Sequence, residues 1–196
     1  LMRKNDDGTF TNVAGILGME VNLVCWGATF FDYDNDSDLD LYVATGCVSG
    51  TALDGELGCS WNGGQSDVLS HNNVLFSNIG NGVFADSSAI SGLDNSYLTT
   101  GTAIGDINND GFYDIYEINE LDSAPSSSNT CRLYKNNMPQ ILNDQRHWVK
   151  IKLEGTHSNK NAIGSRIHVY PQNSASQMRE VMAGESYSSQ SSYTIS

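Results

Sequence analysis

Two segments of this chain place oxygen-bearing side chains at alternate positions. They span residues 32–40 (DYDNDSDLD) and 106–114 (DINNDGFYD), and both fit the pattern D-x-[DN]-x-D-[GS]-x-x-D. Oxygen ligands at alternate positions, followed by a tight turn, wrap a hard cation of the size of calcium. The two loops therefore predict two calcium ions as cofactors.

Each loop offers four side chains and one backbone carbonyl to its ion. In the first loop the predicted side-chain ligands are Asp32, Asp34, Asp36 and Asp40, and Asp38 supplies its carbonyl. In the second loop they are Asp106, Asn108, Asp110 and Asp114, and Phe112 supplies the carbonyl. Serine occupies the sixth position of the first loop, where a tight turn often needs the positive φ that glycine adopts freely. We therefore expect strain at Ser37. The alternative, a solvated acidic turn without a metal, is disfavoured because the pattern recurs in register.

Residues 106–117 also satisfy the expression for an EF-hand loop, with Glu117 at the twelfth position. An EF-hand needs a helix on each side of the loop, whereas the flanking residues here have the composition of strands. The first loop has Val43 at the corresponding position. We therefore interpret Glu117 as a strand residue.

The loops belong to a longer internal repeat. Residues 1–42 align without a gap on residues 75–116, and a third copy begins at Leu133. Each copy contains about four short runs rich in β-branched and aromatic residues, which predict strands. Four short strands per unit are what a β-propeller blade requires. We expect a blade at 1–46, an insertion at 47–74, a second blade at 75–118 and a partial repeat at 131–145.

The chain resembles two known families in succession. Residues 1–137 resemble the FG-GAP/VCBS repeats of integrin-α-type β-propellers, through GATFF before the first acidic loop and LDLYV after it. Residues 146–196 resemble the ASPIC/UnbV module that often follows those repeats, through HWVKIKLEGTHSNKNAIGSRIHVY and QMREVMAGESYSSQSS. The resemblance implies an all-β chain, a partial β-propeller of calcium-loop blades followed by a small C-terminal β-sandwich-like module. A closed propeller needs at least about four blades, so this chain would be a piece of a larger structure.

The C-terminal segment also carries an alternating pattern. In residues 148–153 (WVKIKL) the apolar phase is Val149, Ile151 and Leu153, which suits a strand with one buried face. A second strand would carry Ile167 and Val169, and a third would cover 179–182. We expect these five apolar residues to share one core in a separate β unit that packs on the repeat region and holds no metal of its own.

The net charge of −13 excludes the class of partner that needs clustered Lys and Arg, namely nucleic acid. Part of the acidity is local, because five acidic residues lie in the first loop and three in the second, of 23 in the chain. Carboxylates so close together repel one another unless a cation is bound, which couples metal binding to folding. No stretch approaches the roughly 20 apolar residues of a membrane span.

Four cysteines occur without a Cys-x-x-Cys pair, which argues against a zinc site. Calcium-loaded folds belong mainly outside the cell, where disulfides also persist. Cys47 and Cys59 bracket part of the insertion and could close it, which leaves Cys25 and Cys131 as a second pair. Free buried thiols are the alternative.

Signals for catalysis are weak, since no two histidines have metal-ligand spacing and no G-x-S-x-G elbow occurs. The leading hypothesis is a non-catalytic, extracellular or cell-surface module that binds calcium and recognises a glycan or a protein, as in adhesion. Trp61, in the Gly- and Ser-rich insertion, is a candidate for stacking on a sugar ring or for packing on its own blade. The alternatives are a structural subunit that binds copies of itself in a surface assembly or filament, and an accessory region of a larger secreted enzyme.

Overall fold

The computed structural model describes residues 1–21, 23–46, 72–95, 97–119, 131–141, 147–172, 176–184, 186–187 and 189–195, and the backbone of 61–62 and 65–66. The described chain is all-β, as predicted, and its two helices have four residues each. Cys47, Cys59 and the side chain of Trp61 lie outside the described residues, so the Cys47–Cys59 bridge and the role of Trp61 stay predictions.

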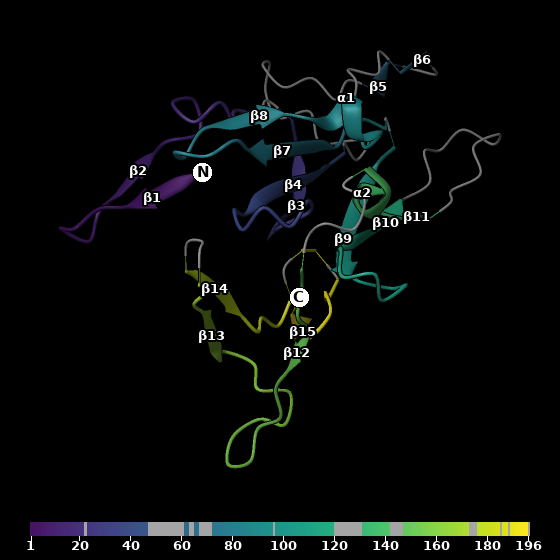
Figure 1. Cartoon of the computed structure of the whole chain (residues 1–196). Helices are drawn as coiled ribbons and strands as arrows, with labels where there is room; N and C mark the ends of the chain where they lie inside the picture. The colour runs from purple at the N-terminus through teal and green to yellow at the C-terminus, as the bar shows by residue number, and fades with distance from the viewer. Residues whose placement is uncertain are drawn as a thin grey trace.

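The elements follow in chain order as β1 (Met2–Lys4), β2 (Phe10–Asn12), β3 (Cys25–Phe31), β4 (Asp40–Thr45), β5 (Trp61–Asn62), β6 (Gln65–Ser66), β7 (Val74–Asn78), β8 (Phe84–Asp86), α1 (Ser88–Ser91), β9 (Thr99–Gly105), β10 (Asp114–Asn119), β11 (Arg132–Tyr134), α2 (Met138–Ile141), β12 (Ile151–Lys152), β13 (Arg166–Val169), β14 (Gln177–Glu180) and β15 (Thr194–Ile195). Two sheets dominate, one in the order β3-β4-β7-β8 and one in the order β11-β10-β9 (Figure 1). The remaining strands form two-stranded ribbons.

The sheets are offset from the sequence repeat, in contrast to the expected blades. The four-stranded sheet takes β3 and β4 from the first copy and β7 and β8 from the second, because β4 pairs with β7 across the insertion. The second sheet repeats this arrangement, since Tyr42 pairs with Leu75 in the first and Tyr116 with Leu133 in the second. The third copy beginning at Leu133 therefore supplies a strand to the sheet of the second copy.

The main core lies between the two sheets. Its buried residues come from strands of both sheets and from the turn after α1, and they are Phe31, Tyr42, Ala44, Leu75, Leu93, Ile104 and Ile115. On the opposite face of the first sheet, Leu41 and Val43 pack with Phe76 and Met19 in a second cluster. Strand β4 is therefore buried on both faces.

Residues 147–195, here called the C-terminal module, form two short ribbons rather than a sandwich (Figure 1). β12 pairs with β15, and β13 pairs with β14. The single core expected from the alternation does not form, because Val149 is 57% exposed. Among the residues of the module that the structure describes, the buried apolar side chains are instead Ala162, Val181 and Ile195. Strands of two residues, such as β12 and β15, cannot bury one continuous face, so this ribbon depends on the neighbouring sheets for its packing.

The C-terminal module docks along the edge strands β3 and β9. Ser186 forms an antiparallel bridge with Gly27, and Ser192 N–H donates to the Ile104 carbonyl at 3.0 Å. Close approach depends on glycine, because a Cβ on Gly27 would lie 1.9 Å from Ser186 Oγ and one on Gly101 would lie 2.9 Å from the Tyr187 carbonyl oxygen. The module is thus bonded to both sheets. Whether it folds as a separate unit stays a prediction.

Cys25 and Cys131 are free and exposed thiols, so the expected pair between them is absent from this structure. In the described parts of the chain, no helix is long and apolar enough to cross a membrane.

Candidate metal centre

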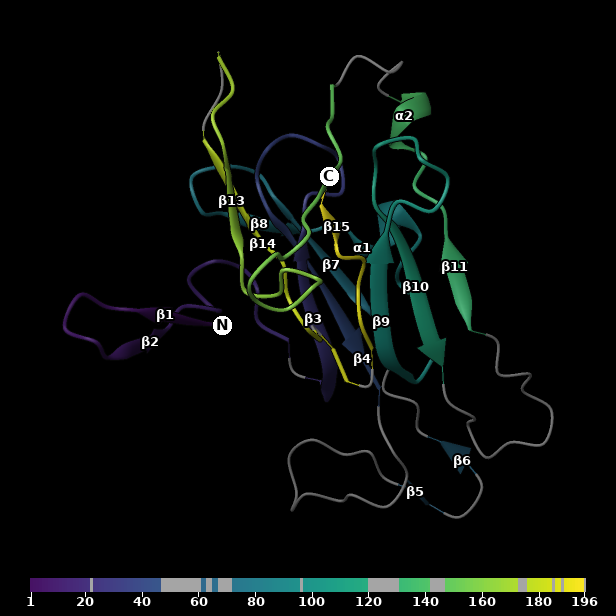
Figure 2. The ribbon, with the colours of Figure 1, turned by 90° about the horizontal axis from the view of Figure 1, so that it is seen from below.

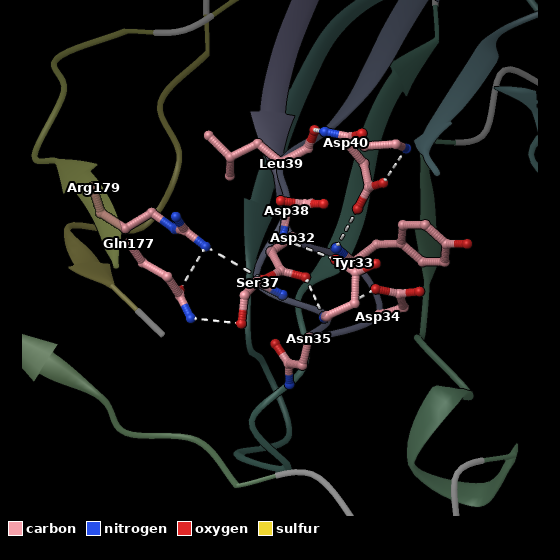
Figure 3. A network of polar contacts seen from close by, with 12 residues as sticks. Asp32, Tyr33, Asp34, Asn35, Ser37, Asp38, Leu39, Asp40, Gln177 and Arg179 are labelled. Carbon is pink, nitrogen blue, oxygen red and sulfur yellow. Dashed lines mark hydrogen bonds and ion pairs between the residues drawn. The ribbon is translucent and has the colours of Figure 1, made fainter. Parts of the chain in front are cut away.

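The first acidic loop connects β3 to β4 and gathers three carboxylates. Asp32, Asp34 and Asp40 each offer an oxygen, and these oxygens all lie within 4.8 Å of one another. Calcium–oxygen distances of about 2.3–2.6 Å allow two ligands of one ion to be at most about 5 Å apart. The spacing and the all-oxygen donor set therefore fit one calcium ion. Asp32 and Asp40 are buried, which places the cluster at the end of the sheet rather than on an open surface (Figure 3).

The loop is shaped by its own backbone N–H groups. Asp32 accepts the N–H of Asp36 on Oδ1 at 3.0 Å and that of Ser37 on Oδ2 at 3.0 Å. Asp40 accepts the N–H of Tyr33 at 3.1 Å, which closes the loop, and that of Asn78 at 2.8 Å, which joins it to β7. The strand pair and the next strand thus hold the carboxylates at both ends of the loop.

The second loop, between β9 and β10, repeats these contacts. Asp106 accepts the N–H of Asp110 on Oδ1 at 3.1 Å and that of Gly111 on Oδ2 at 2.7 Å. Asp114 accepts the N–H of Ile107 at 2.9 Å and that of Asn136 at 2.8 Å. Asn136 takes the place of Asn78, which follows from its position in the third copy. The same scaffold therefore forms twice.

Both loops contain the left-handed turn that the pattern requires. Ser37 has φ of +83° and Gly111 has φ of +89°, and Asn35 and Asn109 at the fourth position are also positive. Serine in this region is strained relative to glycine. Its hydroxyl is held in place, because Gln177 Nε2 donates to Ser37 Oγ at 2.8 Å (Figure 3).

The electrostatics of the first loop disfavour its charged state. Burial raises the pKa of Asp40 to about 7, and the charges of Asp34 and Asp32 add to this. Burial also raises the pKa of Asp32 to about 6, against the opposing charge of Arg179. Desolvation and like charges both destabilise a carboxylate. A divalent cation at the centre of the cluster would reverse both effects.

The predicted ligands do not all converge. Asp36 and Asp38 are exposed, and Asp38 N–H donates to Asp36 Oδ1 at 2.9 Å. In the second loop Asn108 Nδ2 donates to Asp110 Oδ2 at 2.6 Å. Among the described residues, only the first loop brings three acidic side chains within ligand distance of one another. Phe112, expected to give a carbonyl, buries its ring.

Two cations from the C-terminal module contact the loops, and the sequence gives no local sign of them. Arg179 Nη2 lies 3.3 Å from Asp32 Oδ2, and Lys150 Nζ lies 2.8 Å from Asp106 Oδ2. The alternation of residues 148–153 placed Lys150 on the solvent side of a strand. Contacts of this kind depend on tertiary docking and have no short-range pattern.

The comparisons with known proteins concern this C-terminal part. Residues 155–196 match the family model described as ASPIC and UnbV. This ASPIC/UnbV segment includes β13, β14 and Arg179, and it begins after Lys150. No curated protein and no solved structure matched the chain.

A second buried polar centre lies between the two sheets and surrounds Glu117. The side chain of Glu117 is fully buried and accepts the hydroxyl of Tyr42 in the facing sheet. Asn73 Nδ2 donates to it at 3.0 Å, and Asn95 Nδ2 donates at 3.2 Å. Burial raises the pKa of Glu117 above its usual value. Glu117 lies on the same face of β10 as the buried Ile115 and Asn119. An acidic residue at a buried position of this alternation was the sequence signal that could have predicted the centre.

Proposed function

We propose that this chain is a calcium-stabilised β-propeller segment of the FG-GAP/VCBS type, non-catalytic, that serves recognition of a glycan or protein outside the cell or at its surface. The observation that carries the proposal is the acidic loop itself. It recurs with the same backbone contacts at the ends of both sheets, and in the first loop three carboxylates converge at calcium-ligand spacing. Structural calcium is the chemistry that such a buried, oxygen-only cluster supports best.

The packing of the sheets supports radial repetition. Each sheet of a propeller packs one face on the preceding blade and the other on the next. Here Tyr42 of the first sheet is fully buried against the second sheet, whereas Tyr116, its counterpart in the second sheet, is 40% exposed. A further blade would cover Tyr116 as the second sheet covers Tyr42. Leu41 and Val43 face the opposite way and pack on Met19, where a preceding blade would lie.

A structural subunit of a surface assembly is the second candidate. The hairpin of β1 and β2 projects away from both sheets (Figures 1 and 2), and among the described strands β1 pairs with β2 alone. Met2 and Phe10 are more than half exposed on it. An exposed apolar strand pair is a template for pairing with further strands, from this protein or from another chain.

Direct titration with calcium tests the proposed metal sites. We expect isothermal titration calorimetry of the calcium-free chain to show two bound ions. Asp34→Asn and Asp110→Asn should each weaken one of the two, because each removes a charged ligand from one loop. Magnesium should compete poorly, since it demands a smaller octahedral shell. Failure of the wild-type chain to bind calcium at millimolar concentration would refute the proposal.

The raised pKa values predict pH dependences of opposite sign with and without calcium. In the calcium-free chain, Asp32 and Asp40 bind protons more tightly when folded, at pKa values of about 6 and about 7, than in the unfolded chain. The folded state then binds more protons, so its stability rises as the pH falls from 8 towards 5. With calcium bound, protons compete with the ion and stability falls over the same range.

Thermal melts from pH 8 to pH 5, in resin-treated calcium-free buffer and in calcium, check this prediction. Asp40→Asn is the matched control, because it cannot titrate and should flatten the calcium-free profile. A calcium-free melting temperature that falls steadily with falling pH would contradict it.

A further inference from the structure

The C-terminal module places one cationic side chain beside each acidic loop. In both loops the contacted atom is the equivalent one, Oδ2 of the first aspartate. Arg179 Nη2 contacts Asp32 Oδ2 at 3.3 Å, and Lys150 Nζ contacts Asp106 Oδ2 at 2.8 Å. Asp32 and Asp106 hold the first position of their loops. Arg179 lies in β14 and Lys150 precedes β12, so the internal repeat does not account for this equivalence.

The cations leave the other carboxylate oxygen to the ion. Oδ2 of each first aspartate already accepts the N–H of the sixth residue, so the cation completes its two acceptor sites. Oδ1 accepts a single N–H in the same loop, from Asp36 or from Asp110, and retains a lone pair. A carboxylate fixed through Oδ2 presents Oδ1 in one orientation, which is how outer contacts position a metal ligand.

The charges permit a cation and calcium together. The first loop carries five carboxylates, so one calcium and Arg179 leave it negative. The second carries three, which one calcium and Lys150 balance. Both cations are largely buried at the interface, since the side chains of Arg179 and Lys150 are 15% and 24% exposed. Coulomb attraction in such a partly desolvated site is stronger than at the open surface.

Further contacts join the module to the turns that metal binding would order. Gln177 bonds the Ser37 hydroxyl, and Lys150 Nζ donates to Asn109 Oδ1 at 2.6 Å. The indole of Trp148 covers Gly111, where a Cβ would lie 2.1 Å from Trp148 Cδ1. These partners hold the fourth and sixth positions of the loops, which have positive φ.

We propose that Arg179 and Lys150 are positioning residues for the two calcium sites, and that calcium binding and docking of the C-terminal module stabilise each other. This rests on the proposed calcium-binding function. An ion that fixes the loops fixes the docking partners, and by linkage a docked module tightens the binding of the ion by the same factor. Docking of the module is therefore expected to be strongest when both loops hold calcium.

Calcium titration of the full chain tests the positioning role. In an Asp110→Asn background, where the first loop is the remaining site, Arg179→Gln should weaken calcium binding by about 10–100-fold. In an Asp34→Asn background, Lys150→Gln should do the same for the second loop. Arg179→Lys keeps the charge and should lose less. Arg166→Gln is the matched control, because Arg166 pairs with Glu180 within its own ribbon and is exposed.

Hydrogen exchange gives an independent readout, and its first measurement uses the wild-type chain alone, so misfolding of a variant cannot affect it. Calcium should slow amide exchange within residues 147–195, and Arg179→Gln combined with Lys150→Gln should abolish that effect. A wild-type chain that binds no calcium would overturn the proposed function and this inference with it. If the wild type binds two ions but Arg179→Gln binds as tightly or more tightly, or if exchange of 147–195 ignores calcium, the inference alone is overturned.

Discussion

Removal of calcium is expected to lower the melting temperature of this chain by roughly 10–20 °C. A site held at a hundredfold excess over its Kd contributes about 2.7 kcal/mol to the free energy of unfolding. Two sites then contribute about 5 kcal/mol, and a domain of this size shifts by roughly 2–4 °C for each kcal/mol. The effect is large because Asp32 and Asp40 remain buried beside like charges when the ion leaves. Thermal melts followed by circular dichroism, in calcium and in EGTA at pH 8, measure it.

The controls separate ion binding from ionic strength. The double variant Asp34→Asn, Asp110→Asn should melt at one temperature in both buffers, since it lacks a ligand in each loop. Magnesium at the same concentration should restore little of the lost stability. Equal midpoints for the wild-type chain in calcium and in EGTA would show that the loops are not structural calcium sites.

The acidic loops could be predicted from sequence because their geometry is local. Except for the bond from Asn78 to Asp40, the N–H bonds that bring the carboxylates of the first loop together span at most seven positions. The positive φ of Ser37 and Gly111 follows from the same kind of turn. Such contacts are encoded within one window of the chain. The second loop shows the limit of this reasoning, since its Asn108 and Asp110 side chains bond each other.

The placement of the sheets could not be predicted from the repeat alone. A sequence repeat fixes a period but not where along it the hydrogen-bonded sheet begins. Here β4, the strand after the first loop, pairs across the insertion with β7, the opening strand of the next copy, with Tyr42 opposite Leu75. The alternation of apolar residues in the C-terminal module also predicted a core that does not form. Strands as short as β12 are buried by contact with neighbouring sheets and not by one face of their own. Lys150 and Arg179 contact the acidic loops only because the C-terminal module docks on the two sheets.

Glu117→Ala is expected to lower the free energy of unfolding by about 3–5 kcal/mol. The Glu117 carboxylate is the common acceptor for Tyr42, Asn73 and Asn95, and it links the facing sheets through the main core. A buried donor left without an acceptor costs about 1–3 kcal/mol, and truncation leaves two such donors, on Tyr42 and Asn73, and a third on the half-buried Asn95. The Tyr42 hydroxyl cannot donate to bulk water instead, because its side chain is fully buried. Burial also raises the pKa of Tyr42 well above its usual value. Urea unfolding at pH 7 gives the measurement.

Two further variants help to interpret a loss of stability in Glu117→Ala. Glu117→Gln keeps one acceptor oxygen but turns an amide N–H₂ towards other donors, so it should fall between the wild type and Glu117→Ala. Glu154→Ala removes a carboxylate that is 74% exposed, and its stability should stay within about 0.5 kcal/mol of the wild type. Calcium affinity should hold in Glu117→Ala as long as the chain is folded, because the network contacts neither loop. A loss below about 1 kcal/mol would mean that water replaces the carboxylate and that the two sheets are held together by the apolar core alone.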